Sequence, residues 1–249
     1  MKKQRAFETA YRQLALEFGC RPEDFTRPGL TLTPAAFRPG SRETIPKAPM
    51  LLMAGTGNSV AVSADENLRR LVEELAGKVN GLHRLFEFPA LRDLDAGLRK
   101  HGRTLWGAEH FFLPGGPLRE TALPEELRYR WFDAETVREF YPNNRFPMAL
   151  GAEPNPSRPD VIALAALDGS RIIGVAGASA DTEMMWQVGI DVTEGYRGRG
   201  LGTALVSALS REIERRGKLP FYGTAAGNLH SQAIAVRCGF VPAWIETDA

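Results

Sequence analysis

The residues best placed to do chemistry form a glycine-rich run between an expected strand and an expected helix. In order they are Arg197, Gly198, Arg199, Gly200, Leu201, Gly202 and Thr203. Glycine lets a backbone curl tightly and approach a ligand without a Cβ in the way. The first N–H groups of a helix have no intrahelical partner and lie at the positive end of its dipole, so this turn is suited to a phosphate or pyrophosphate. Arg197 and Arg199 can add charge-assisted contacts.

Two common phosphate-binding motifs do not fit this run. A P-loop carries Lys-Ser or Lys-Thr after its last glycine, and neither pair follows here. The dinucleotide motif needs the spacing G-x-G-x-x-G after the first strand of its domain, whereas these glycines recur at every second residue and lie late in the chain. The sequence therefore disfavours an NTPase and a dinucleotide fold.

This part of the chain resembles a known family. Arg197, Gly200 and Gly202 match the Q/R-x-x-G-x-G/A signature of the GNAT superfamily of acyl-CoA-dependent N-acyltransferases, and residues 190–196 look like its fourth strand and splay. A second match comes at the family's later spacing, at Asn228, Ser231, Gly239 and Phe240. The resemblance covers about residues 129–249.

The resemblance implies an acetyl-CoA-dependent N-acetyltransferase that acts on a primary amine. The turn at 197–203 would hold the CoA pyrophosphate, and Ile190 and Val192 would pair their backbone with the pantetheine arm as an added strand. Asn228 and Ser231 would touch the cofactor near its sulfur. In such enzymes the amine attacks the thioester directly, without a covalent enzyme intermediate, so the chemistry needs a neutral amine, a donor to the carbonyl oxygen and a proton for the leaving thiolate.

The catalytic side chains depart from the family pattern. The tyrosine that often serves as general acid, seven residues past the asparagine, is Ala235 here. The proton must then come from water, from the substrate, or from a side chain such as Tyr222 or Ser231. The candidates for the base or for a proton relay are, in order of preference, Glu183, Asp191 and His230.

Other reactive residue types have simpler interpretations. Cys238 is expected to be a small buried hydrophobe, because no paired histidine or positive surroundings are indicated. Met184, Met185 and Trp186 are expected in the core. The histidines show no metal-ligand spacing, so no metal is predicted.

The elements that position the turn come from the second half of the chain. Strands are expected at 129–132, 161–167, 171–179, 184–192, 221–224 and 240–245, and helices at 134–141, after the turn as far as Gly217, and from Asn228. Residues 168–170 favour a hairpin, and Asp133 is expected to cap the first helix. With the resemblance, this order predicts an α/β fold of the layered α+β type, in which a mixed, mostly antiparallel GNAT-like sheet carries flanking helices.

The first half reads as a smaller α/β domain that resembles no family we recognise. Helices are expected at 6–19, at 66–77 after the cap Asp65, and at 89–100; strands are expected at 30–32, 50–54 and 59–63, with a turn at 55–58. A breaker cluster at 114–124 predicts a division into residues 1–120, of unknown role, and 121–249, the acetyltransferase-like domain. The first half can form a lid, a surface for a homodimer, or a decayed copy of the same fold. The loop 142–159 and this half are expected to choose the acceptor.

Composition excludes several classes. The chain has 249 residues with 31 basic and 30 acidic side chains, so no whole-chain basic field favours nucleic acid. Its two cysteines are far apart, which fits a reducing cytoplasm and excludes a disulfide scaffold. No membrane segment is predicted, because the longest charge-free run contains proline and polar residues.

Two alternatives to the enzyme stay open. One is a CoA-binding module that has lost catalysis and serves as a sensor or interaction domain, which the missing tyrosine favours slightly. The other is a nucleotide-binding protein that uses the same turn. The expected substrates of the enzyme are acetyl-CoA and a small-molecule or peptide amine.

Overall fold

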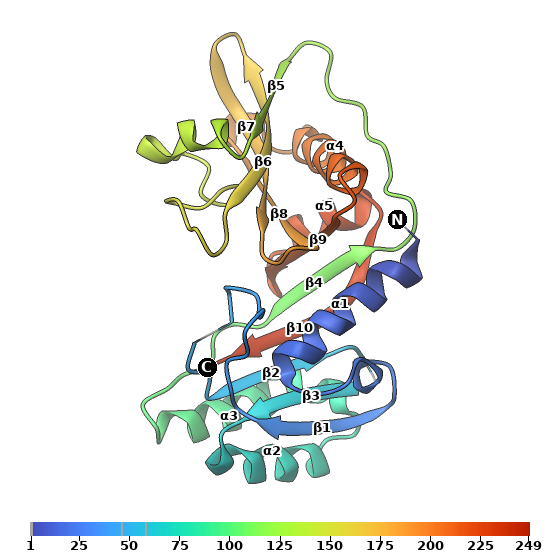
Figure 1. The fold of residues 1–249 in the computed structure, drawn as a ribbon, viewed down its shortest axis with the longest axis vertical. Coiled ribbons are helices and arrows are strands. Elements are labelled where there is room, and N and C mark those ends of the chain that lie inside the picture. Colours follow the sequence, from blue (N-terminus) through green and yellow to red (C-terminus); the bar gives the residue numbers. More distant parts are fainter. Residues whose placement is uncertain (1, 46, 58) are drawn as a thin grey trace. The chain divides into compact units, whose positions relative to one another are not determined.

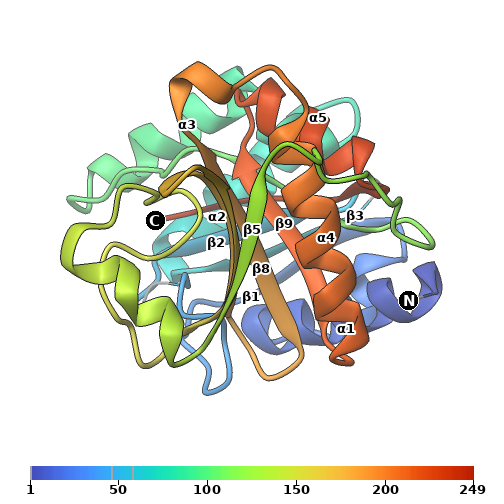
Figure 2. The ribbon, with the colours of Figure 1, turned by 90° about the horizontal axis from the view of Figure 1, so that it is seen from above.

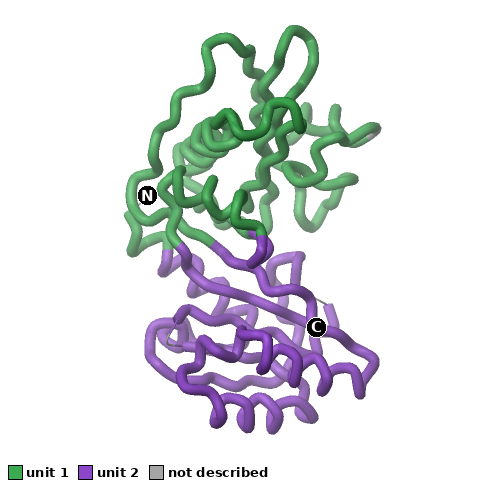
Figure 3. Tube along the Cα trace, turned by 180° about the vertical axis from the view of Figure 1, so that it is seen from behind, with its two compact units in different colours: residues 1–6, 112–223, 228–241 green, residues 7–111, 224–227, 242–249 purple. Residues whose placement is uncertain are grey.

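The structure is a computed structural model that describes residues 2–45, 47–57 and 59–249. The chain divides into two compact units, one made of residues 1–6, 112–223 and 228–241, the other of residues 7–111, 224–227 and 242–249 (Figure 3). We call them the site unit and the amino-terminal unit. The proposed domains 1–120 and 121–249 stay a prediction, and the compact units group the chain differently because its last residues belong with the amino-terminal unit.

The site unit is built on antiparallel strands with one parallel strand added (Figure 1). Its strands pair in the order β9-β8-β7-β6-β5, and only the β8–β9 pair is parallel. Their bounds are β5 (Arg128–Asp133), β6 (Asp160–Asp168), β7 (Arg171–Ala180), β8 (Met185–Val192) and β9 (Leu219–Ala225). The predicted hairpin at 168–170 joins β6 to β7.

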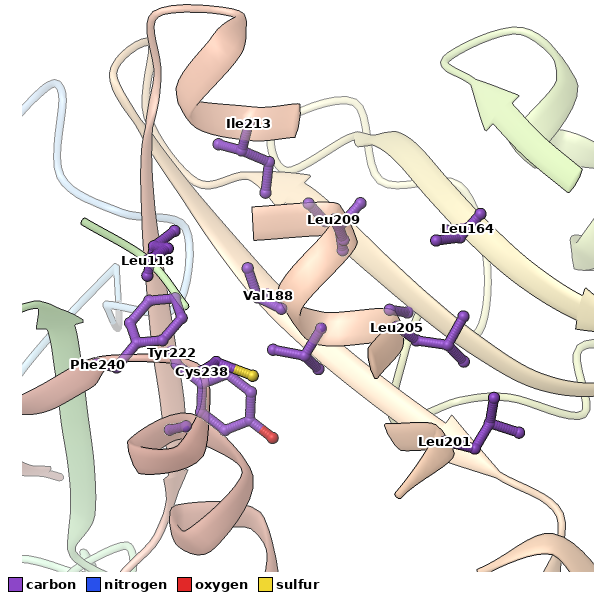
Figure 4. Packing of buried hydrophobic residues seen from close by; sticks show 14 of the residues in the cluster. Leu118, Leu164, Val188, Leu201, Leu205, Leu209, Ile213, Tyr222, Cys238 and Phe240 are labelled. Atoms are coloured by element: carbon purple, nitrogen blue, oxygen red, sulfur yellow. The ribbon is translucent and has the colours of Figure 1, made fainter. Parts of the chain in front are cut away.

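Helix α4 (Leu201–Arg215) lies across one face of these strands (Figure 2). Its apolar stripe packs there: Leu201, Leu205, Leu209 and Ile213 are buried in one cluster with Val188 of β8 (Figure 4). Four buried apolar side chains at a spacing of four residues contribute about 1.5–3 kcal/mol each by transfer from water. The helix ends before Gly217, which adopts φ 77° as expected of a glycine at a helix end. This packing holds the amino terminus of α4 in place.

The opposite face of β6 and β7 carries a second apolar cluster. Phe132, Phe140, Phe146 and Leu150 pack there against Val175 of β7. The helix predicted at 134–141 is instead the 3₁₀-helix η3 (Thr136–Asn143). Asp133 accepts hydrogen bonds from the backbone N–H groups of residues 135 and 136, but the N-cap of η3 is Glu135, so the prediction that Asp133 caps this helix is wrong.

The amino-terminal unit is a mixed sheet with strand order β1-β3-β2-β10. The bounds of the elements that lie wholly or mostly in it are α1 (Lys3–Phe18), η1 (Pro22–Phe25), β1 (Gly29–Pro34), β2 (Leu51–Gly55), β3 (Ser59–Ala64), α2 (Glu66–Lys78), η2 (Leu82–Phe86), α3 (Phe88–Arg99) and β10 (Phe240–Asp248). Strand β4 (Glu109–Pro114) is divided between the two units after residue 111. The predicted cap Asp65 accepts from Asn67 N at 3.0 Å. The sequence missed β4 and the 3₁₀-helices, and Asn58 of the predicted turn lies outside the described residues.

A buried ion triad ties distant parts of this unit together. The Arg42 guanidinium lies 2.7 Å from a carboxylate oxygen of Glu17 and 2.8 Å from one of Glu246, and all three side chains are buried. Burial alone would lower the pKa of Arg42, but the two carboxylates outweigh it and hold that pKa well above its usual value. Because Glu246 lies on β10, the last strand of the chain completes the interior of a unit made mostly of amino-terminal residues.

The fold class predicted from the sequence is confirmed. The strand pairings are mostly antiparallel, with parallel pairs at β1–β3 and β8–β9, and helices flank the strands in both units.

Candidate functional site

The glycine-rich turn has the conformation that an anion site requires. Gly198 and Gly200 adopt φ 76° and 84°, values that favour glycine over other residues. Gly200 is the N-cap of α4 and no side chain caps the helix. Residues 197–200 are exposed. The N–H groups of the first turn of α4 therefore face an exposed bend with no capping side chain in competition for them.

The turn is joined closely to the strand edge and to the next helix. A Cβ added to Gly202 would lie 3.3 Å from Cδ1 of Ile234, 3.6 Å from Cγ1 of Ile190 and 3.8 Å from Cγ2 of Val192. The start of α4, the end of β8 and the middle of α5 (Leu229–Arg237) thus meet at one glycine.

Strands β8 and β9 pair over only part of their length. The register runs from Met185↔Leu219 to Val188↔Tyr222, while on its other side β8 stays paired with β7 as far as Gly174↔Val192. Residues 189–192 therefore present a strand edge that β9 does not cover. This is the splay that the sequence predicted from residues 190–196, and it places Ile190 and Val192 next to the turn.

The two arginines of the turn have different partners. Arg197 Nε donates to the carbonyl oxygen of Val192 at 2.7 Å, and its guanidinium lies 3.6 Å from the Asp191 carboxylate. Arg199 lies over the ring of Tyr196, 5.8 Å from its centroid. Arg197 thus joins the strand end to the turn, and its side chain is 64% exposed, which leaves it accessible to an anion.

The start of α5 brings the second predicted group of residues together. Asn228 is the N-cap, and its side chain accepts from Ser231 N at 3.1 Å. Ser231 Oγ lies 2.8 Å from the hydroxyl of Tyr222, the β9 residue at which the pairing with β8 ends. Burial raises the pKa of Tyr222 to about 12, so this phenol keeps its proton at neutral pH. Figure 4 shows the Tyr222 ring inside the core with its hydroxyl directed toward α5.

The three candidates for the catalytic base lie in different places. Glu183 is exposed in the turn before β8, at the other end of that strand from the glycine-rich bend. Asp191 lies on β8 beside Arg197 and is half-buried. His230 is exposed in the first turn of α5. The structure thus brings Asp191 and His230 to the end of the strand pair where the turn lies, and not Glu183.

Of the residues expected in the core, Cys238, Met185 and Trp186 lie there and Met184 does not. Ala235 and Cys238 are fully buried in the core, and burial raises the pKa of the Cys238 thiol to about 12. Met185 is buried and Trp186 packs against the same core, but Met184 is 36% exposed and lies outside it.

The loop expected to shape the acceptor pocket covers the other face of β7 and β8. A pocket of about 400 Å³ lies within it, and its lining residues are 151–156, 158 and 160. Arg158 bridges Asp181 and Gln187 at 2.9 and 2.8 Å. Burial raises the pKa of Asp160, against the hydrogen bonds that it accepts from Gly151 N and Tyr141.

Within residues 2–45, 47–57 and 59–249, no group of three or more His, Cys, Asp or Glu side chains is arranged to hold a metal ion. No helix of that part of the chain has the length and apolar character needed to cross a membrane.

One protein family matches part of this sequence. The sequence model of the acetyltransferase (GNAT) family matches residues 125–240. This segment of the chain is therefore similar to the GNAT acetyltransferase family. No curated protein sequence matches the chain.

Solved structures of this family are similar at low identity. A GCN5-related N-acetyltransferase-like protein from Streptococcus suis 89/1591 is 18% identical over 65% of this chain and 69% of that chain, with a TM-score of 0.48. A GCN5-related N-acetyltransferase from Kribbella flavida is 17% identical over 84% and 89%, with a TM-score of 0.44. A putative acetyltransferase of the GNAT family from Novosphingobium aromaticivorans DSM 12444 is 14% identical over 58% of this chain and 63% of that chain, with a TM-score of 0.42. The chain therefore spans less than two thirds of that protein.

Sequence reasoning missed one feature of the site. Gly177 and Gly189 lie directly opposite each other on β7 and β8 and are covered by backbone atoms of residues 148–149. A glycine inside a strand often marks a close approach by another backbone segment. Both expected strands, 171–179 and 184–192, contain such a glycine.

Proposed function

We propose that the chain is an acetyl-CoA-dependent N-acetyltransferase that acts on a primary amine. The observation that carries this proposal is the uncapped amino terminus of α4 beside the open edge of β8, with two glycines at positive φ between them. The backbone N–H groups of residues 198–203 would hold the pyrophosphate, and the edge at 189–192 would pair with the pantetheine arm. Arg197 and Arg199 would add charge.

The splay directs the acyl group to the place where β8 and β9 part. Asn228 and Ser231 lie on α5 at that end, next to Tyr222. The amine nitrogen attacks the acetyl carbon, a C–N bond forms and the C–S bond breaks. The nitrogen loses one proton and the leaving sulfur gains one, so the products are the N-acetyl amine and the CoA thiol. Acetyl-CoA supplies only the thioester; the protein orients the two reactants.

We propose that the Tyr222–Ser231 pair returns the proton to sulfur. Each hydroxyl can donate one hydrogen bond while it accepts another, so the pair can pass a proton without a net change in its own charge. Ser231 lies toward the start of α5, and Tyr222 is buried behind it. This pair would replace the tyrosine that the family places at the position of Ala235.

For the base we favour Asp191 over Glu183 and His230. Asp191 shares the face of β8 with Gly189, and at about 3.3 Å per residue the two positions are roughly 7 Å apart. Glu183 precedes Met185, the first residue of β8, which is itself about 13 Å from Gly189. At that separation a water between carboxylate and amine can carry the proton. His230 remains the second candidate.

The test is release of the CoA thiol when wild-type protein, acetyl-CoA and a panel of amines are combined, read with a thiol reagent. Spermidine, kanamycin, lysine and a tripeptide sample the amine classes. Release with at least one amine supports the proposal. Tight binding of acetyl-CoA by calorimetry without release from any amine would favour the second candidate, a sensor or interaction module, for which the observation is Ala235 in place of the tyrosine. Thermal protection by nucleotides but not by acetyl-CoA would instead indicate a nucleotide-binding protein.

A further inference from the structure

The segment Asn144–Gly151, which we call the acceptor wall, lies against the site unit's sheet at the level where β8 and β9 part. Two glycines permit this approach. A Cβ added to Gly189 would lie 2.4 Å from the carbonyl oxygen of Met148 and 3.0 Å from that of Ala149. A Cβ added to Gly177 would lie 2.4 Å from the same Ala149 oxygen. Distances below 3.0 Å cannot be tolerated against backbone, so only glycine fits at both positions.

The two glycines form one flat patch. Gly177 on β7 and Gly189 on β8 are register partners, so their missing side chains would have pointed to the same face. Gly189 is the first residue of β8 after the last pair with β9, Val188↔Tyr222. The carbonyl oxygens of Met148 and Ala149 therefore rest on the sheet where the open edge begins.

The acceptor wall is held rigidly from both ends. Asn144 Oδ1 accepts from Phe146 N at 2.8 Å, and Asn144 Nδ2 donates to the Gly151 carbonyl at 2.7 Å. Gly151 N donates to Asp160 Oδ2 at 2.9 Å. The side chains of Phe146 and Leu150 are buried in the apolar cluster on this face. The position of the two carbonyls is thus set by packing and hydrogen bonds before any substrate arrives.

We propose that the Met148 and Ala149 carbonyl oxygens form the docking point for the acceptor's primary amine, and that Gly177 and Gly189 are the positioning residues that set it. A neutral primary amine has two N–H donors and one lone pair. When backbone oxygens accept from the N–H groups, the lone pair is left to point at the acyl carbon at the strand edge. Backbone acceptors recognise the nitrogen and not the rest of the molecule, so the wall selects an unhindered primary amine over a secondary or tertiary one. This inference rests on the proposed function.

Gly177→Ala is the decisive variant because Gly177 lies on β7 and not on the edge that would meet pantetheine. Its Cβ must displace the acceptor wall. With the best amine of the panel named above, we expect at least a tenfold rise in the KM for that amine while the Kd for acetyl-CoA, measured by calorimetry, stays within twofold. If Gly177 had a purely structural role, the variant would bind both the amine and acetyl-CoA more weakly.

Two further variants separate displacement of the wall from loss of stability. Gly97→Ala is the control, because its Cβ would lie 2.5 Å from Leu71 Cδ2, a short contact with the end of a side chain in the amino-terminal unit. It should leave both constants unchanged. Asn144→Ala removes the side chain that ties the ends of the wall and adds no atom, so it should also raise the amine KM, even if Gly177→Ala does not fold.

The outcomes distinguish the inference from the proposed function. If wild-type protein releases no thiol with any amine, the proposed function fails and the inference with it. If the wild-type protein turns over but Gly177→Ala keeps the amine KM of the wild type, the function stands and the docking point is wrong. If Gly177→Ala does not fold, the same conclusion follows from an unchanged amine KM in Asn144→Ala. A fall in acetyl-CoA affinity equal to the rise in amine KM would also overturn it.

Discussion

The Tyr222–Ser231 hydrogen bond is the contact on which the proposed return of the proton depends. The sequence lacks the family's tyrosine at Ala235, and in the structure that alanine lies on the buried side of α5. A phenol from β9 instead lies 2.8 Å from a hydroxyl on α5. The acid of this site is therefore expected to depend on a contact between a strand and a helix.

Replacement of Tyr222 by Phe tests this relay. We expect kcat to fall at least about tenfold, because proton transfer by a positioned group contributes typically more than that, while the Kd for acetyl-CoA is unchanged. Ser231→Ala should give a similar loss. Since the two hydroxyls act in series, the double variant should lose no more than the worse single variant. Additive losses in steady-state kinetics would show that the two groups act separately.

A second residue-scale effect concerns Asp248 on β10. Burial, Glu246 and Glu109 raise the pKa of its carboxyl to about 6. The folded state therefore binds the proton more tightly than the unfolded chain. The stabilisation that results is fully present below about pH 4 and is lost as the pH rises through about 6.

Asp248→Asn imitates the protonated form at every pH. We expect the variant and the wild type to have equal stability at pH 4, and the variant to be more stable by about 1 kcal/mol at pH 8, a value reduced to allow for solvent screening of a partly exposed group. Urea unfolding followed by tryptophan fluorescence at both pH values measures the difference. A variant less stable than wild type at pH 8 would contradict the assignment.

At the scale of elements, the site depends on the junction of a strand end with a helix start. The amino terminus of α4 provides N–H donors, but its position comes from the apolar stripe that packs on β6, β7 and β8. The edge of β8 is open only because its pairing with β9 stops at Val188↔Tyr222. A substitution in either element should therefore weaken the binding of acetyl-CoA more than the binding of the amine.

Gly202 offers a direct test at this junction. Gly202→Ala adds a Cβ that stays at least 3.3 Å from its neighbours, so the fold and the affinity for acetyl-CoA should change little. Gly202→Glu adds a carboxylate beside the expected pyrophosphate and should weaken acetyl-CoA at least about tenfold, which is about 1.4 kcal/mol. Calorimetry of both variants gives the comparison. Equal affinities would move the pyrophosphate away from this turn.

At the scale of the whole molecule, neither half of the sequence is self-sufficient. Strand β10 pairs with β2 from Ile245↔Gly55 to Asp248↔Leu52, and its Glu246 completes the ion triad with Glu17 and Arg42. A buried charge that loses one partner typically costs about 3–5 kcal/mol. The last residues of the chain are thus part of the interior of the amino-terminal unit.

A fragment of residues 1–120 should therefore not fold independently. It lacks the strand that covers β2 and leaves Arg42 with one of its two carboxylates. We expect no cooperative thermal transition by circular dichroism for the fragment alone, and recovery of a transition when a peptide of residues 240–249 is added in excess. A cooperative transition of the fragment without the peptide would support a boundary at residue 120.

What the sequence by itself determined was local. The cofactor turn, its glycines and the helix behind it were predictable, because conformational freedom at Gly198 and Gly200 and the apolar spacing of α4 are properties of adjacent residues. The caps at Asp65 and Asn228 and most strands were predictable for the same reason.

What only the tertiary structure decided were contacts between residues far apart in the chain. The separation of β8 from β9, the Tyr222–Ser231 pair and the glycine patch under the acceptor wall each join different elements, so no local pattern encodes them. The same holds for the return of β10 to β2. Burial of apolar surface sets the positions of the helices and strands, and these positions decide which polar groups can form hydrogen bonds. Both depend on the folded chain as a whole.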